Sequence, residues 1–140
     1  MKRYALLGTS LSHSFSQQYF SEKFLKEKIK NTEYFNIELD NLNGLKKKIT
    51  QLNLSGFNVT IPYKEEIIKQ LDVLSEQANI VQSVNTVKVI RGKLHGYNTD
   101  VSGFEKSLIP FLKNRNQAII LGNGGASKSI QYVLKKLNIN

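Results

Sequence analysis

The 140-residue sequence contains no cysteine and no tryptophan, only one methionine and only two prolines. The absence of cysteine excludes a disulfide framework, a thiolate zinc site and a thiol nucleophile, and it suits a cytoplasmic location. Long hydrophobic runs are missing as well, because the opening MKRYALLGTSLSHSF holds one short apolar stretch before Gly8. That stretch is too short for a signal sequence or a membrane span. We therefore expect no membrane association, and we expect no metal site.

Acidic residues are also scarce, with 11 against 20 lysines and arginines, so the net charge is +9. Such a balance is typical of nucleic-acid-binding proteins, which show a steeply salt-dependent affinity. Here the lysines are spread over EKFLKEKIK, LKKKI, KEEIIK and VLKKL, at the solvent-facing positions of helical patterns, and no arginine-rich arm is present. We expect a solvated lysine-rich surface and no nucleic-acid partner. A positive surface also steers small anionic ligands inward.

Short apolar runs alternate with stretches of helical periodicity along most of the chain. The period of two predicts strands at 4–7, 34–39, 57–61, 83–90, 93–97 and 118–121. The period of 3.6 predicts helices at 14–29, 42–52, 65–71, 73–78 and 101–112, and a last helix after GNGGASKS that ends at 137. This alternation indicates an α/β fold with a mostly parallel sheet and flanking helices. Arg91-Gly92 favours a hairpin, and Thr99 is a candidate cap for the helix that contains Pro110.

Three polar stretches are candidates for a site. The first, Gly8 to Gln18, places five hydroxyls and an imidazole between a strand end and a helix start. Hydroxyls and free backbone N–H groups there suit a carboxylate or a phosphate. The simpler alternative is that Ser12 or Ser14 caps the helix and His13 is a surface turn residue.

The second stretch is NVTIPYK, from Asn58 to Lys64. Pro62 ends the strand, and Lys64 then places a cation at the positive end of the next helix. The simple interpretation is a surface lysine paired with Glu65 or Glu66. The functional alternative is an amine at the carboxyl end of a strand, where open α/β sheets bind ligands.

The third stretch, GNGGAS from Gly122 to Ser127, follows an apolar run and precedes a helix, as a dinucleotide-binding turn does. It departs from G-x-G-x-x-G because Ser127 stands at the third glycine position, and an ordinary strand-to-helix turn is the alternative. Two further clusters, SVNT at 83–86 and YNTD at 97–100, each place Asn-Thr near a strand end, where turns and caps also favour these residues.

Together these stretches resemble the shikimate dehydrogenase family: SHSFS, NVTIPYKEE, VNT, GYNTD and GNGGAS appear in the family's order and at nearly its spacing. The resemblance implies an α/β substrate domain over 1–114 and the first strand and helix of a Rossmann NADP-binding domain over 115–140. A rise in polarity near 112–117 is consistent with that boundary. The implied reaction is the NADPH-dependent reversible reduction of 3-dehydroshikimate to shikimate, on the route to chorismate and the aromatic amino acids, by a monomer or homodimer.

The resemblance also implies a role for each matching residue. Ser14 and Ser16 are expected to bind the substrate carboxylate, and Thr60, Asn85 and Asp100 the ring hydroxyls. Lys64 and Asp100 are the expected catalytic pair, and Lys64 also contacts substrate. The expected NADP(H)-binding residues are Gly122, Asn123, Gly124, Gly125, Ala126 and Glu76.

The sequence departs from the family pattern in two ways. Ser10 and Gln17 stand where the family usually has proline, Phe20 where it often has histidine, and Asn123 where alanine is common. Family members are also nearly twice as long, and a single strand and helix after Gln117 need a partner to bury their apolar faces. We therefore expect weak shikimate binding and little NADPH turnover from these residues alone. The alternative is a non-catalytic shikimate-binding module that pairs with another chain.

Overall fold

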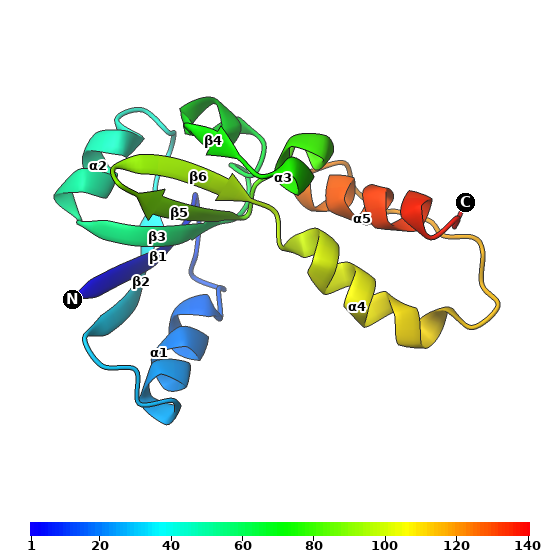
Figure 1. Ribbon diagram of the computed structural model, residues 1–140, viewed down its shortest axis with the longest axis horizontal. Coiled ribbons are helices and arrows are strands. Elements are labelled where there is room, and N and C mark those ends of the chain that lie inside the picture. Colours follow the sequence, from blue (N-terminus) through cyan, green and yellow to red (C-terminus); the bar gives the residue numbers. More distant parts are fainter.

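A computed structural model describes residues 1–140, and its centre is a six-stranded sheet with the order β2-β1-β3-β5-β6-β4 (Figure 1). The strands are β1 (Lys2–Gly8), β2 (Thr32–Glu38), β3 (Leu54–Val59), β4 (Val73–Leu74), β5 (Thr86–Ile90) and β6 (Lys93–Tyr97). The helices are α1 (Ser16–Lys26), α2 (Leu45–Gln51), the 3-10 helix η1 (Glu66–Gln70), α3 (Glu76–Val81), α4 (Asp100–Leu112) and α5 (Gly125–Lys136).

The sheet is mixed. Strand β1 is parallel to β2 and β3, whereas β5 is antiparallel to β3 and β6, and β4 is parallel to β6. The expected α/β fold and the hairpin at Arg91-Gly92 are confirmed. Because β6 runs in the same direction as β1 and β3, these three strands end at one edge of the sheet, and β5 begins there.

Alternating side chains of the strands bury two separate clusters. Ala5 and Leu7 face the main core, which α2 and η1 cover with residues such as Ile49 and Ile67. Leu6 faces the other side, where Tyr34 stacks on Phe20 of α1 at a centroid distance of 4.4 Å. The sheet therefore lies between α1 on one face and α2 and η1 on the other, as alternation along a strand requires.

Two expected elements are wrong. The helix expected at 73–78 begins only at Glu76, because Val73–Leu74 pair with β6 and the Ser75 hydroxyl accepts a hydrogen bond from Ala78 N at 3.3 Å. The strand expected at 118–121 does not form. Ile119 and Leu121 are 89% and 95% exposed, and no strand lies beside them to complete a ladder.

Helices α4 and α5 extend away from the sheet as a separate arm (Figure 1). Val133 of α5 is fully buried against Val81 of α3 and Val101 of α4, which form a third small core. The expected need of the last helix for a partner is thus met within this chain. No helix of the protein combines the length and the apolar character needed to cross a bilayer.

Candidate active site

Lys64, Asp100 and Asn85 form one hydrogen-bonded group. The Lys64 ammonium donates to Asp100 Oδ2 at 2.7 Å, and the Asn85 amide donates to Asp100 Oδ1 at 2.7 Å. The side chains of Lys64 and Asp100 are 16% and 29% exposed, so the pair is largely shielded from water. The expected pairing of Lys64 with a neighbouring glutamate is wrong, because Asp100 holds it instead.

Strand direction explains how residues distant in sequence meet. Lys64 follows β3 and Asp100 follows β6, at the shared edge where both strands end, while Asn85 directly precedes β5 at that edge. The backbone strengthens this arrangement, since Val84 N donates to Lys64 O at 2.7 Å and Val59 N to Asn85 O at 2.9 Å. The directions of the strands in this mixed sheet therefore bring the three residues together.

The serines of the first stretch reach the same edge from the end of β1. Ser14, Ser16 and Thr60 line a cleft of about 750 Å³ together with the exposed His13. The Ser14 hydroxyl accepts a hydrogen bond from Ser16 N at 3.2 Å. Phe15 holds the cap position of α1 and no side chain caps that helix, so the alternative of a Ser12 or Ser14 cap is wrong. The two hydroxyls and Thr60 thus face one cleft, and Ser14 serves a structural role as well.

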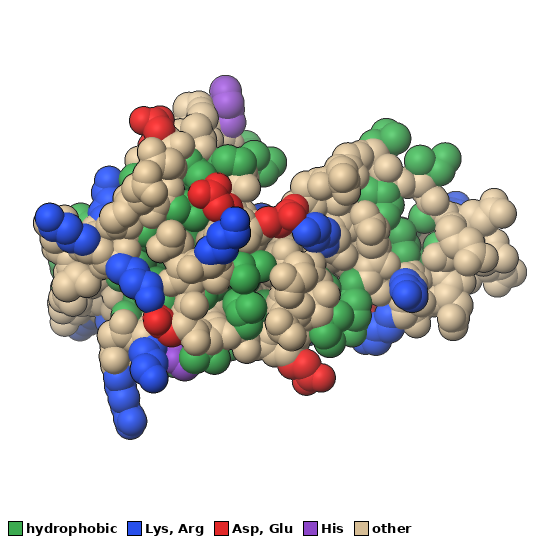
Figure 2. Space-filling model, turned by 90° about the horizontal axis from the view of Figure 1, so that it is seen from above, with side chains coloured by type: hydrophobic (Ala, Val, Ile, Leu, Met, Phe, Trp, Pro, Cys, Tyr) green, Lys and Arg blue, Asp and Glu red, His purple; other side chains and the backbone are tan.

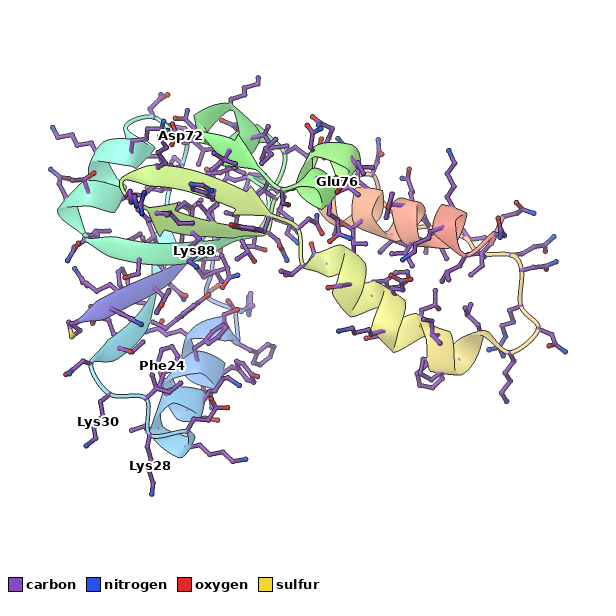
Figure 3. The ribbon with its side chains drawn as sticks, viewed as in Figure 1. Phe24, Lys28, Lys30, Asp72, Glu76 and Lys88 are labelled. Atoms are coloured by element: carbon purple, nitrogen blue, oxygen red, sulfur yellow. The ribbon has the colours of Figure 1, made fainter.

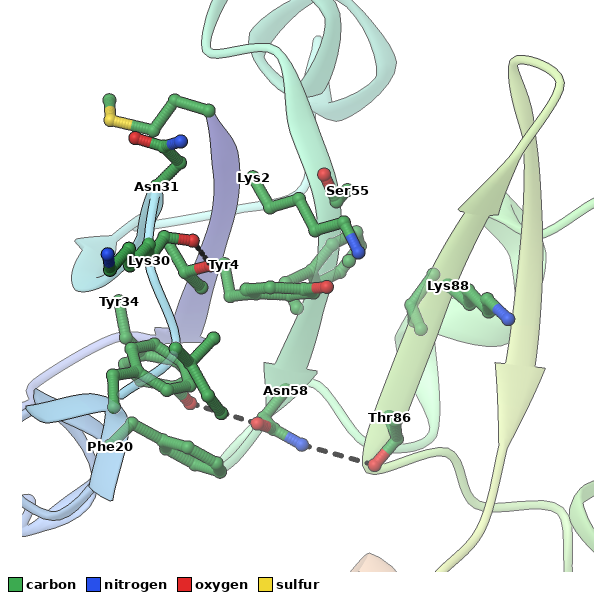
Figure 4. Close-up of a pocket in the computed structure, with 17 residues that line it drawn as sticks. Lys2, Tyr4, Phe20, Lys30, Asn31, Tyr34, Ser55, Asn58, Thr86 and Lys88 are labelled. Atoms are coloured by element: carbon green, nitrogen blue, oxygen red, sulfur yellow. Dashed lines mark hydrogen bonds between the residues drawn. The ribbon is translucent and has the colours of Figure 1, made fainter. Parts of the chain in front are cut away.

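A second cavity of about 710 Å³ opens on the α1 face and contains none of the predicted site residues. On its wall Tyr34 donates to Asn58 Oδ1 at 2.9 Å, and Asn58 donates to Thr86 Oγ1 at 3.1 Å (Figure 4). Asn58 also donates to Asn85 O at 3.3 Å. Burial raises the pKa of Tyr34 to about 12, and Ser16 lowers it by a smaller amount.

The glycine-rich turn lies directly against Lys64. A Cβ placed on Gly125 would lie 2.7 Å from the Lys64 Cβ and 2.8 Å from Ser83 Oγ, so only glycine allows this approach. Gly122 has φ of +125°, and a Cβ on Gly122 or Gly124 would meet nothing within 4 Å. A further link is the ion pair between Lys128 of α5 and Glu65 at 2.5 Å. The N-terminus of α5 therefore docks beside the candidate lysine.

Comparison with known sequences decides the family. Residues 6–87, more than half of the chain, match the family described as "Shikimate dehydrogenase substrate binding domain". The chain belongs to this family. A relative from Clostridium beijerinckii, named "Shikimate dehydrogenase (NADP(+))", is 41% identical over 138 residues, which cover 96% of this chain and 51% of the relative. The chain thus spans about half the length of the curated relatives it matches.

Solved structures of shikimate dehydrogenases share the fold. One from Peptoclostridium difficile superposes with a TM-score of 0.90 at 37% identity and covers 99% of this chain and 53% of its own length. One from Thermus thermophilus, in complex with shikimate, superposes with a TM-score of 0.85 at 29% identity and covers 99% and 54%. The arrangement of sheet and helices described above is therefore that of shikimate dehydrogenases.

Glu76 is not brought to the group. It is an exposed residue in the first turn of α3, where Figure 3 labels it. Its expected place near the cofactor stays a prediction. The basic side chains are spread over the surface, as expected: Figure 2 shows them at several places on the visible face, most with neutral or acidic surface between them.

Sequence reasoning missed several supporting residues of this shikimate dehydrogenase fold. Asn98, which is 4% exposed, caps α4 by accepting from Val101 N at 3.1 Å, whereas the expected cap Thr99 makes no such bond. Its position inside YNTD was a signal, since asparagine just before a helix often caps it. Ser83 lies in the SVNT stretch but was assigned no role, and Ser129 carried no signal, because their contacts with Asn98 join segments far apart in sequence.

Proposed function

We propose that this chain is the substrate-binding part, with the first phosphate-binding turn, of an NADP-dependent shikimate dehydrogenase. The reaction is the reversible reduction of 3-dehydroshikimate to shikimate. The observation that carries the proposal is the Lys64–Asp100–Asn85 group at one edge of the sheet. Family membership and the shikimate complex of the Thermus thermophilus relative support it.

Two sets of polar side chains provide the groups that the substrate needs. Ser14 and Ser16 offer hydroxyls from the loop after β1, which suits the substrate carboxylate. Thr60, Asn85 and Asp100 offer the donors and acceptors that ring hydroxyls need. The net charge of +9 adds a long-range attraction for an anionic substrate.

Lys64 is the proton donor and acceptor in this proposal. Reduction of a ketone develops negative charge on its oxygen, and a neighbouring ammonium both stabilises that charge and delivers a proton. In the oxidation direction a neutral amine accepts the hydroxyl proton. The Asp100 carboxylate holds the Lys64 side chain in place. The Asn85 amide, in turn, orients that carboxylate by donating to its other oxygen. Bound NADPH supplies the hydride.

The glycine-rich turn fits a pyrophosphate. The open space around Gly122 and Gly124 lets a phosphate approach the backbone, and the 12-residue helix α5 directs its N-terminal N–H groups and partial positive charge toward that space. Gly122 to Ala126, with Asn123 in the turn, are the residues we assign to the cofactor, with Glu76 as a further candidate. We accordingly assign 1–114 to the substrate domain and 115–140 to the NADP-binding domain.

Calorimetric titration of the 140-residue chain with shikimate and with NADP, in separate experiments, tests the proposal. We expect measurable shikimate binding, weak or no NADP binding, and no robust NADP-dependent oxidation of shikimate, because the chain spans about half of its full-length relatives. Absence of shikimate binding would reject the proposed function. Strong turnover by the 140-residue chain would reject only the expectation that it needs further residues.

A second candidate is a non-catalytic shikimate-binding module that pairs with another chain, because the matched family model over residues 6–87 describes a substrate binding domain. Such a module binds shikimate and ignores NADP even when the second half of a full-length relative is supplied. Turnover after that addition distinguishes the enzyme from the module.

A further inference from the structure

Asn98 makes three hydrogen bonds to three separate segments although it touches neither Lys64 nor Asp100. Its Nδ2 donates to Ser83 O at 2.9 Å and to Ser129 Oγ at 2.9 Å, and its Oδ1 accepts from Val101 N at 3.1 Å. The side chain is 4% exposed, and Ser83 and Ser129 are fully buried. A buried amide whose donors and acceptor are all used fixes its neighbours strongly.

Two of these bonds hold segments that position Lys64 and Asp100. The Ser83–Val84 peptide accepts from Asn98 through its carbonyl and donates through its N–H to Lys64 O at 2.7 Å. The next residue, Asn85, holds the Asp100 carboxylate. The Val101 bond caps α4 at the turn where Asp100 begins that helix. The Asn98 side chain thus supports three parts of the site: the backbone of Lys64, the start of helix α4 at Asp100, and the segment that carries Asn85.

The third bond extends this control to the glycine-rich turn. Ser129 lies one turn into α5, whose first residue, Gly125, packs on the Lys64 Cβ and on Ser83 Oγ. The Asn98–Ser129 bond therefore sets the position of α5 relative to the same peptide that supports Lys64.

We propose that Asn98 is a positioning residue that holds the Lys64–Asp100 pair and the start of α5 in one arrangement. This inference rests on the proposed function for its catalytic meaning, although the positioning itself does not require a ligand. The sequence signal was present in YNTD, but only the structure shows that the asparagine joins α4, α5 and the 83–85 segment.

The test compares Asn98→Ala with Val101→Ala in the 140-residue chain, at a temperature where both variants are folded. The Val101 side chain lies in the small core between α3, α4 and α5, so its truncation destabilises α4. The Asn98 bond is kept, because it uses the backbone N–H of residue 101. Two quantities are measured: the dissociation constant for shikimate, and the rate at which acetic anhydride labels Lys64 relative to the other lysines.

We expect Asn98→Ala to weaken shikimate binding and to speed Lys64 labelling by about tenfold each, a factor that corresponds to about 1.4 kcal/mol. Val101→Ala should change neither by more than about twofold, although it lowers the melting temperature. Equal effects of the two variants, or no effect of Asn98→Ala, would overturn the proposal. If the unsubstituted chain fails to bind shikimate, the proposed function fails, and Lys64 labelling still decides the role of Asn98.

Two further variants separate the bonds and cover the case in which Asn98→Ala does not fold. Asn98→Asp keeps the shape and the acceptor for Val101 N but faces the Ser83 carbonyl with a carboxylate, so it should reproduce the faster Lys64 labelling. Ser129→Ala removes only the α5 bond, and it should speed amide exchange in α5 while leaving shikimate affinity unchanged. Ser127→Ala is its control, because that hydroxyl donates within the same turn to Gly124 O. Wild-type labelling in Asn98→Asp would contradict the proposal.

Discussion

Lys64 is the residue on which the proposed chemistry depends most. We expect Lys64→Ala, in an enzyme completed with the second half of a full-length relative, to lower kcat by about 10²- to 10⁴-fold, the usual contribution of a general acid or base. Shikimate affinity should change far less, because Asn85, Thr60 and the two serines remain. Steady-state kinetics and shikimate titration separate the two effects.

Lys64→Arg and Lys69→Ala complete that experiment. Arginine keeps the positive charge but does not release a proton, so Lys64→Arg should be nearly as inactive as Lys64→Ala. Lys69 is an exposed lysine of η1, and its removal should leave the rate unchanged. An unchanged rate in Lys64→Ala would remove this residue from the mechanism.

Tyr34 makes stability depend on pH. Its pKa of about 12 in the folded protein lies above the ordinary value of 10.0 because the phenol is buried. Since the folded pKa is raised, its contribution to stability is fully present below pH 10 and is lost as pH rises toward 12. Tyr34→Phe, which leaves Asn58 Oδ1 without its donor, should be about 1 kcal/mol less stable at neutral pH. Near pH 12 the difference should reverse, after a change on the order of 2 kcal/mol.

Urea unfolding of both proteins between pH 7 and 12 measures this difference, and Tyr19→Phe, at a 57% exposed tyrosine, is the control. A constant difference between the two proteins across that range would show that the phenol of Tyr34 is not buried.

Gly125 and Gly103 are glycines at helical positions with opposite surroundings. A Cβ on Gly125 collides with Lys64 and Ser83, whereas a Cβ on Gly103 of α4 meets nothing within 4 Å. We expect Gly125→Ala to destabilise the fold by about 1–3 kcal/mol, as overpacking does, and to weaken shikimate binding. Gly103→Ala should stabilise the fold by about 0.5–1 kcal/mol, because alanine restricts the unfolded chain. Thermal unfolding gives both values, and a neutral Gly125→Ala would mean that α5 does not dock on Lys64.

At the scale of elements, the segment 118–121 and α5 provide a matched comparison. Val133 in α5 is fully buried, whereas Ile119 and Leu121 are 89% and 95% exposed. Val133→Ala should destabilise the protein by about 2 kcal/mol, since it leaves a cavity. Ile119→Ala and Leu121→Ala should each change stability by less than about 0.5 kcal/mol. If urea unfolding shows a large loss of stability in Ile119→Ala, the Ile119 side chain is buried in a contact and the expectation is wrong.

Periodicity predicted most elements because it depends on neighbours in sequence. The alternation of β1 and the hairpin between β5 and β6 follow directly from local pattern and from the turn at Arg91-Gly92. The expected strand at 118–121 was wrong because an apolar run becomes a strand only beside another strand. The helix expected at 73–78 was wrong because a two-residue pairing with β6 overrides local helical pattern.

The same distinction applies to the candidate site. Ser14, Lys64, Asn85 and Asp100 were proposed as site residues because each lies in a stretch that resembles a shikimate dehydrogenase motif. Asn98 was assigned no role, because its three partners lie 3, 15 and 31 residues away along the chain. The candidate site residues lie in short local motifs, whereas the contacts of Asn98 depend on the folded arrangement.

The molecule has two parts, the sheet and the α4–α5 arm, whose cores differ in size. Fifteen buried residues form the core under the sheet, whereas the core at the α4–α5 arm has only three buried residues, Val81, Val101 and Val133, with partly buried side chains around them. Regions with few buried apolar contacts open at lower free energy than the main core. We therefore expect the arm to open while the sheet stays folded.

Native-state hydrogen exchange in low urea measures this opening amide by amide. Amides of α5 should exchange at least about tenfold faster than those of β1 and β3, with a smaller dependence on urea, since less surface is exposed in the local opening. Val133→Ala should widen the gap without changing the strands. Equal rates and equal urea dependence would show a single cooperative unit. Because α5 carries Gly125 against Lys64, each detachment of α5 separates the glycine-rich turn from the candidate proton donor. The opening free energy obtained from α5 exchange therefore sets an upper limit on the fraction of time that the two are apart.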